Sequence, residues 1–253
     1  MGSSWGLVLA VGALSGLTVH GLAGAPAPAA SATSAEHVAV ERFLAEIEKP
    51  PVRYEARRRL EASTAKLKES AWMEVVTHYT PESGFEYSIV AQGGSERIQR
   101  RVLRSVLEAE KGSLSRSEWQ KVNLSRLNYD FNFGGRTPDG MLKMQLNPRR
   151  RDSRLVEGAA LLTAASGDLV RIEGRLSKSP SFWVRWVDVS RSYASIRGVM
   201  MPVAINSTAD VKIAGLSTFV MTYDYHTVDG EAVNAAPGMA LSTASQATPI
   251  PNR

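Results

Sequence analysis

The sequence predicts an α+β fold, in which a strongly curved antiparallel β-sheet forms an unclosed half-barrel and helices act as its lid. Helix-like patterns are confined to the first half of the chain, and strand-like alternation of apolar and polar residues dominates the rest. About ten such strands would make a sheet too long to stay flat, so it must curl around its apolar face. The 253 residues include no cysteine, so this core forms without disulfides.

Residues 1–35 predict a signal peptide followed by a spacer. They contain no Lys, Arg, Asp or Glu, and residues 6–22 are mostly apolar. Small residues that a signal peptidase accepts occur at Ala23 and Ala32. The apolar run is short for a membrane span, although an uncleaved anchor is the alternative because no basic residue precedes the run. We therefore expect a periplasmic protein, and the lack of cysteine excludes a lipid-modified cysteine.

Residues 36–48 have the periodicity of an amphipathic helix. Val40, Phe43, Leu44 and Ile47 fall on one stripe, and two prolines at 50–51 end the helix. The period then changes to two, which predicts strands at 53–62, 71–80 and 85–92.

A helical insert is expected after these strands. Ser95 can cap a helix that runs to Lys111, with Gly112 as its stop. A second, short helix follows, because Ser115 and Glu118 have the spacing of a capping box.

The remaining pattern is nearly all strand. We expect strands at 128–133, 141–147, 169–176, 181–189, 198–205 and 217–225. Residues 36–230 would thus form one domain, and residues 231–253, which lack periodicity, a flexible C-terminal tail.

The sequence offers no set of residues typical of an active site. His37 and Glu41 share a helix face, but no third metal ligand lies near them. His78 and His226 could each pair with a serine, yet the expected nucleophile motif G-x-S-x-G is missing from the mature chain. We therefore expect no enzyme, no cofactor and no metal site, and a lipid-acting hydrolase is the weaker alternative.

A basic triplet of Arg149, Arg150 and Arg151 lies in a predicted turn between strands. The net charge of +5 suits anionic lipid headgroups or simple solubility. Aromatic residues do not interleave with the triplet as they would in a nucleic-acid binder, and export argues against that partner. The triplet is therefore either a solvated turn or a contact for lipid headgroups.

Large apolar residues recur on one face of several predicted strands. Such residues usually form a packed core, but the apolar face of a half-barrel can also hold an acyl chain. On this second interpretation the candidate ligand-binding residues are Phe85, Tyr87, Tyr129, Phe131, Phe133, Met144, Ile172, Trp186, Met221 and Tyr223.

Two segments of the chain resemble the LolA-like superfamily. They are MLKMQLNPRRRDSRLVEG (141–158) and GDLVRIEGRLSKSPSFWVRWVDVSRSY (167–193). The superfamily includes periplasmic lipoprotein carriers, outer-membrane lipoprotein-sorting proteins and the sensor domain of an envelope-stress regulator. The resemblance implies a monomeric carrier without catalysis that binds a lipid or an acylated lipoprotein in its concave face and serves outer-membrane biogenesis. The alternative is an envelope sensor or interaction module with a membrane-protein partner.

Overall fold

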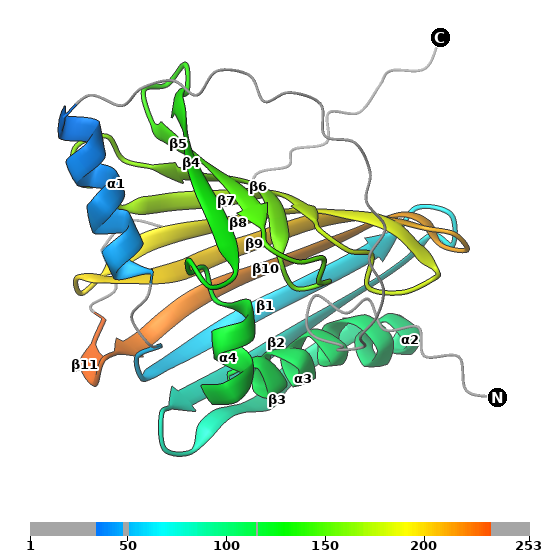
Figure 1. Ribbon diagram of the computed structural model, residues 1–253. Helices are drawn as coiled ribbons and strands as arrows, with labels where there is room; N and C mark the ends of the chain where they lie inside the picture. The colour runs from blue at the N-terminus through cyan, green and yellow to red at the C-terminus, as the bar shows by residue number, and fades with distance from the viewer. Residues whose placement is uncertain (1–33, 48–50, 115, 234–253) are drawn as a thin grey trace, which may run out of the picture.

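The computed structural model describes residues 34–47, 51–114 and 116–233. The strands form one antiparallel sheet of eleven strands in the order β3-β2-β1-β10-β9-β8-β7-β6-β5-β4, with β11 paired to β10 (Figure 1). They are β1 (Tyr54–Thr64), β2 (Glu69–Thr80), β3 (Gly84–Gly94), β4 (Tyr129–Arg136), β5 (Leu142–Pro148), β6 (Val156–Leu162), β7 (Leu169–Leu176), β8 (Val184–Ile196), β9 (Val199–Val211), β10 (Gly215–Val228) and β11 (Glu231–Ala232).

The helices are few and lie on the concave side of the sheet. They are α1 (Ser34–Glu46), α2 (Glu96–Ile98), a π-helical turn (Gln99–Leu103), α3 (Arg104–Ser113) and α4 (Arg116–Val122). None of the helices in these described ranges is long and apolar enough to cross a membrane.

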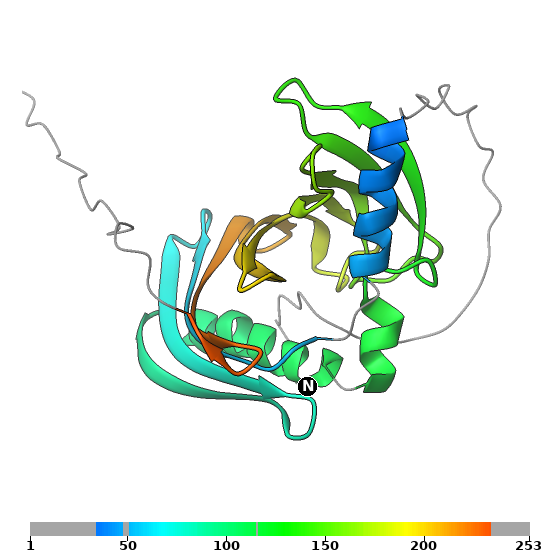
Figure 2. The same ribbon diagram turned by 90° about the vertical axis from the view of Figure 1, so that its left-hand side faces the viewer.

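The predicted α+β half-barrel is confirmed. The sheet is bent rather than flat, with β1–β3 on one side and β4–β5 on the other (Figure 2). Nearly all neighbouring strands are also consecutive in the chain, and the exception is β1, which pairs with β10 from Tyr54 opposite Val228 to Thr64 opposite Ser217. Strands β3 and β4 remain as the two free edges, and the chain segment that holds α2, α3 and α4 runs from one edge to the other.

The helical insert differs from the single helix expected from Ser95 to Lys111. Ser95 does cap the first turn, since its hydroxyl accepts a hydrogen bond from the Ile98 amide. A π-helical turn then separates α2 from α3, and α3 continues past Gly112 to Ser113. A π-turn inserts one extra residue into the helical repeat, which apolar periodicity does not reveal. Of the expected capping box, Ser115 lies outside the described residues.

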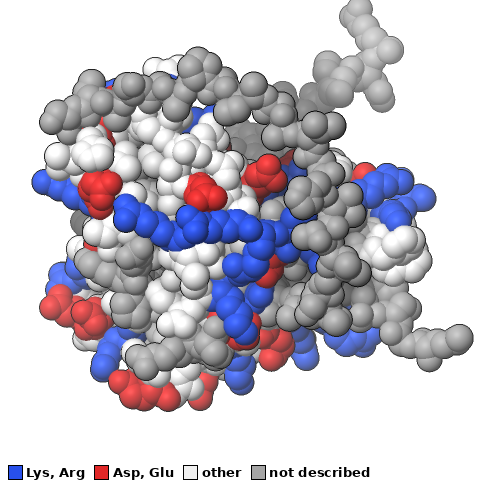
Figure 3. Space-filling model, viewed as in Figure 1, with Lys and Arg blue, Asp and Glu red and all other residues white. Residues whose placement is uncertain are grey.

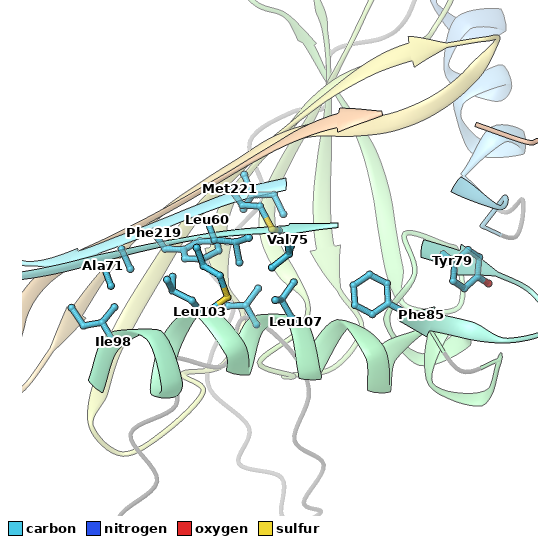
Figure 4. Packing of buried hydrophobic residues seen from close by; sticks show 14 residues of the cluster. Leu60, Ala71, Val75, Tyr79, Phe85, Ile98, Leu103, Leu107, Phe219 and Met221 are labelled. Atoms are coloured by element: carbon cyan, nitrogen blue, oxygen red, sulfur yellow. The ribbon is translucent and has the colours of Figure 1, made fainter. Parts of the chain in front are cut away.

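Two clusters of buried side chains hold the helices to the sheet. In the first, Ile98, Leu103 and Leu107 point from the insert toward β1, β2 and β10 (Figure 4). Leu103 and Leu107 are fully buried, as are Leu60 and Met73 opposite them. Complete burial of each such side chain stabilises the fold by about 1.5–3 kcal/mol.

The second cluster joins α1 to the other half of the sheet. Phe43 is buried against β4–β7 and meets the Phe131 ring edge-on, with 6.2 Å between the ring centroids. Gly167, in the turn between β6 and β7, lies so close to α1 that a Cβ there would be 2.2 Å from the Ala39 carbonyl oxygen. The helices therefore cover the two halves of the sheet separately, α1 over one and the insert over the other.

Candidate functional site: a cavity beneath the helices

A cavity of about 350 Å³ lies between the middle of the concave face and the helices α3 and α4. Its apolar wall comes from both layers, with Met200, Ile205 and Met221 on the sheet and Val106 and Trp119 on the helices. A second cavity of about 730 Å³ beside the C-terminal end of α1 shares three lining residues with the first, namely Val52, Met200 and Met201. The volumes fall within the range of about 300–1,000 Å³ typical of ligand pockets.

Arg58 projects from β1 into this apolar layer, and its side chain is only 1% exposed. Its guanidinium donates two hydrogen bonds to the Glu110 carboxylate on α3, at 2.7 and 3.0 Å, and one to the Tyr54 hydroxyl at 2.7 Å. The Tyr223 and Phe85 rings lie 4.5 and 5.2 Å from the guanidinium carbon. Sheet and lid helix are thus joined by a buried, bidentate ion pair at the cavity wall.

Arg154 joins the second lid helix to the sheet in a similar way. It donates to both Asp152 oxygens in the turn between β5 and β6, and to Glu118 on α4, all at 2.9 Å. Burial acts to raise the pKa of the Asp152 carboxyl, but the hydrogen bonds from Arg154 outweigh it, and the pKa is lowered. Asp152 therefore remains charged at neutral pH and holds Arg154 in place.

A third arginine, Arg191, lines the cavity from β8. It lies on the same face of the strand as Val189, between Ile172 of β7 and Ile205 of β9. Its side chain is exposed, although the strand around it lies on the concave side of the sheet. Solvent in the cavity therefore reaches this guanidinium.

The structure separates the ten predicted ligand-binding residues into several environments. Met221 and Tyr223 line the cavity. Phe85 and Tyr87 belong to the cluster beneath α3, where the Tyr87 hydroxyl donates to Glu108 at 2.6 Å. Burial, together with this hydrogen bond, raises the pKa of Tyr87 to about 12. The cluster beneath α1 contains Tyr129, Phe131, Phe133, Met144 and Ile172.

Trp186 lies on the opposite face of the sheet from the cavity. It precedes Val187, which is buried on the same face of β8 as Val189, and adjacent strand residues point to opposite faces. Arg175 covers its ring, with the guanidinium carbon 4.9 Å from the ring centroid. Trp186 is therefore part of the outer surface.

The triplet Arg149, Arg150 and Arg151 lies between β5 and β6, as expected. Arg149 pairs with Asp130 at 2.7 Å, and Arg150 donates to the Asn128 side chain at 2.7 Å. Arg151 donates to the Ser177 carbonyl at 3.1 Å. Each guanidinium thus has a protein partner, and a role in binding lipid headgroups stays a prediction.

Sequence reasoning missed the three arginines of the cavity, although a signal for two of them was present. Arg58 occupies an inward position between Ala56 and Leu60, and Arg191 occupies one two residues after Val189. A charge at an inward position of an otherwise apolar strand face requires a partner, because burying an unpaired charge is costly.

The sequence matches no protein-family model and no curated protein sequence. Among solved structures, similarity is found to a LolA superfamily protein from Nitrosomonas europaea, with 12% identity and a TM-score of 0.38 over 80% of this chain and 94% of that one. A DUF1329 family protein from Desulfovibrio piger ATCC 29098 is similar at 10% identity and a TM-score of 0.35, over 76% of this chain and 92% of that one. Both scores are low, so the functional proposal rests on this chain's own residues.

Proposed function

We propose that this protein is an exported, non-catalytic carrier that binds an amphiphilic lipid, or the acyl chains of a lipoprotein, in the cavity beneath its helices. The observation that carries the proposal is the cavity itself, which is walled by Met, Ile, Val and Trp side chains and adjoins a wider one. Methionine side chains are flexible and polarizable, which suits a ligand without a fixed shape.

The polar groups of the cavity favour binding over catalysis. No histidine lines it among the described residues, and the carboxylate that does, Glu110, is held by Arg58. Ser113 is likewise occupied, because its hydroxyl donates to the Ala109 carbonyl at 2.7 Å. A nucleophile with an adjacent base, which a lipid hydrolase requires, is not formed by these groups. The uncharged, mostly apolar residues at 1–35 support a periplasmic location.

Filling the cavity should abolish lipid binding. Met200 lines both cavities and is half-buried, so a Met200→Trp side chain can enter them with a cost in stability of about 1–3 kcal/mol at most. We expect the full chain, purified from a periplasm, to carry lipid in native mass spectrometry, and the M200W variant to carry at least tenfold less, about 1.4 kcal/mol in binding free energy.

Thr222→Trp is the matched control, because Thr222 is exposed on the outer face of β10. This variant should retain its lipid. A parent protein that emerges empty and binds no added fatty acid would contradict the carrier function.

A further inference from the structure

One of the arginines that line the cavity has no ion-pair partner among the described residues. Of the three lining arginines, Arg58 is paired with Glu110, and Arg154 with Asp152 and Glu118. Arg191 forms no ion pair with any carboxylate in the part of the chain that the structure describes. Its guanidinium hydrogen-bonds to the Tyr193 hydroxyl, and Tyr223 lies near it. The Glu110 carboxylate also acts on it, but from beyond ion-pair distance and while bound by Arg58.

Because Arg191 has no carboxylate partner among the described residues and solvent in the cavity reaches it, an anion that enters the cavity can bind its guanidinium. The apolar wall beside it lowers the local dielectric, which strengthens that attraction. Arginine is suited to this role, since its planar fork donates two parallel hydrogen bonds to a carboxylate or a phosphate.

We propose that the cargo is an anionic amphiphile whose carboxylate or phosphate group binds Arg191 while its acyl chain lies against the apolar wall that includes Met200 and Met221. This inference rests on the proposed carrier function and adds the class of head group. Burial raises the pKa of the Tyr223 hydroxyl, so that hydroxyl stays neutral and can donate a further hydrogen bond to the anion.

The test compares ligands that share one chain but differ in the head group. The full-length protein would be titrated with oleate, oleyl alcohol and oleyl phosphate, each competing with a fluorescent fatty-acid probe. We expect the parent to bind the two anions about 10- to 100-fold more tightly than the alcohol. In Arg191→Met this preference should vanish, with affinity for the alcohol unchanged, and Arg191→Lys should restore part of it.

Arg175→Met is the matched control, because it removes the same charge from the outer face of β7. It should keep the preference for anions. A preference between oleate and oleyl phosphate would show whether the head group that binds Arg191 is a carboxylate or a phosphate. Equal binding of anion and alcohol by the parent would overturn the role of Arg191 and leave the carrier function standing. Failure to bind any of the three would instead overturn the carrier function.

A separate observation concerns one end of the half-barrel, where three connections meet (right side of Figure 1). The turn between β1 and β2 is hydrogen-bonded to the turn between β9 and β10, from the Lys66 amide to the Ala214 carbonyl at 3.1 Å. The Lys212 amide in turn donates to the Trp183 carbonyl, in the loop between β7 and β8, at 2.9 Å. We call this end the tip.

The tip combines exposed apolar side chains with lysines. Four of the seven large apolar side chains that are exposed among the described residues lie there: Leu67, Phe182, Ile213 and Leu216, exposed by 38%, 76%, 41% and 51%. Lys66, Lys68 and Lys212 lie on the same turns and form no ion pair with the described carboxylates. Lys and Arg atoms flank uncharged atoms at this end of the surface (Figure 3).

The geometry points to docking of the tip on an anionic bilayer surface. Exposed aromatic and aliphatic side chains enter the interface between headgroups and acyl chains, and each lysine near anionic lipid adds about fivefold to the affinity. The lysines therefore favour an anionic lipid surface over a neutral one. This proposal for the tip does not depend on which cargo the cavity binds.

The tip can be tested by flotation of the full chain with vesicles. We expect binding to vesicles of phosphatidylcholine with phosphatidylglycerol, loss of that binding at high salt, and little binding to phosphatidylcholine alone. Phe182→Ser should weaken binding several-fold, and Leu127→Ser, at a site elsewhere of similar exposure, should not. Equal binding to both vesicle types, or an effect of L127S as large as that of F182S, would overturn the proposal. If F182S lost a crosslink to an envelope protein but still bound vesicles, the tip would bind a protein partner and the proposal would be overturned.

Discussion

Glu110→Ala should destabilise the protein by about 3–5 kcal/mol, because it leaves the Arg58 guanidinium buried without its counter-ion. The Tyr54 hydroxyl and the aromatic rings around Arg58 would remain, but none of them carries a compensating charge. Glu110→Gln should cost less, since the amide oxygen still accepts a hydrogen bond. Urea unfolding gives the change in free energy, and hydrogen exchange of α3 reports whether the lid loosens before the sheet unfolds.

A double variant distinguishes the cost of losing the ion pair from the cost of leaving the Arg58 guanidinium buried without a counter-ion. Arg58→Met combined with Glu110→Leu removes both charges and keeps most of the buried volume. Replacing a buried ion pair with apolar groups is often neutral or stabilising, so this variant should recover most of the stability that Glu110→Ala loses. If Glu110→Ala unfolded at the same urea concentration as the parent, Arg58 would be solvated in the native state and the ion pair would have no structural role.

Gly158→Val should have a comparably large effect, through the backbone of the sheet. Gly158 of β6 lies directly opposite Gly174 of β7. A Cβ on Gly158 would lie 2.1 Å from the Glu173 carbonyl oxygen, and one on Gly174 would lie 2.2 Å from the Glu157 carbonyl oxygen. No side chain fits there unless the two strands separate. We expect a loss of about 3 kcal/mol, at the upper end for overpacking, because ladder hydrogen bonds are lost as well.

Gly112→Ala provides the control for this prediction. Gly112 lies in α3, and a Cβ there would meet no atom within 4 Å. Alanine is the better helix former, so this variant should be about 0.5–1 kcal/mol more stable than the parent. If Gly158→Val unfolded at the same temperature as the parent, β6 and β7 would have to be farther apart in solution than the structure shows.

The strands were predictable where one face of the sheet is exposed to solvent and the other is buried. Alternation located β4, β5 and β10 to within a few residues. It did not predict β6, since the residues Ala159 to Leu162 are all buried and alternation disappears. The π-helical turn was also missed, because one extra residue in a helical repeat leaves the apolar pattern almost unchanged.

The candidate site was less predictable than the fold. Alternation assigns a residue to a face, but the tertiary structure decides what covers that face. Met221 lines the cavity, whereas Phe131 lies on a comparable strand face but is covered by α1. The pairing of Arg58 with Glu110 joins residues 52 positions apart in the chain, and no local pattern connects them.

The two free edges of the sheet, β3 and β4, are joined by the chain segment that bears the lid helices. Backbone hydrogen bonds between neighbouring strands connect β3 to β4 through the sheet. On the open side, the same two edges are connected only by the covalent chain. The segment at 95–128 therefore closes the open side of the barrel. Any widening of the interior requires this segment to extend. The π-helical turn (Gln99–Leu103) and the turns at 123–128 interrupt the helices of this segment, so the space available to a bulky cargo depends on this connection as well as on the number of strands.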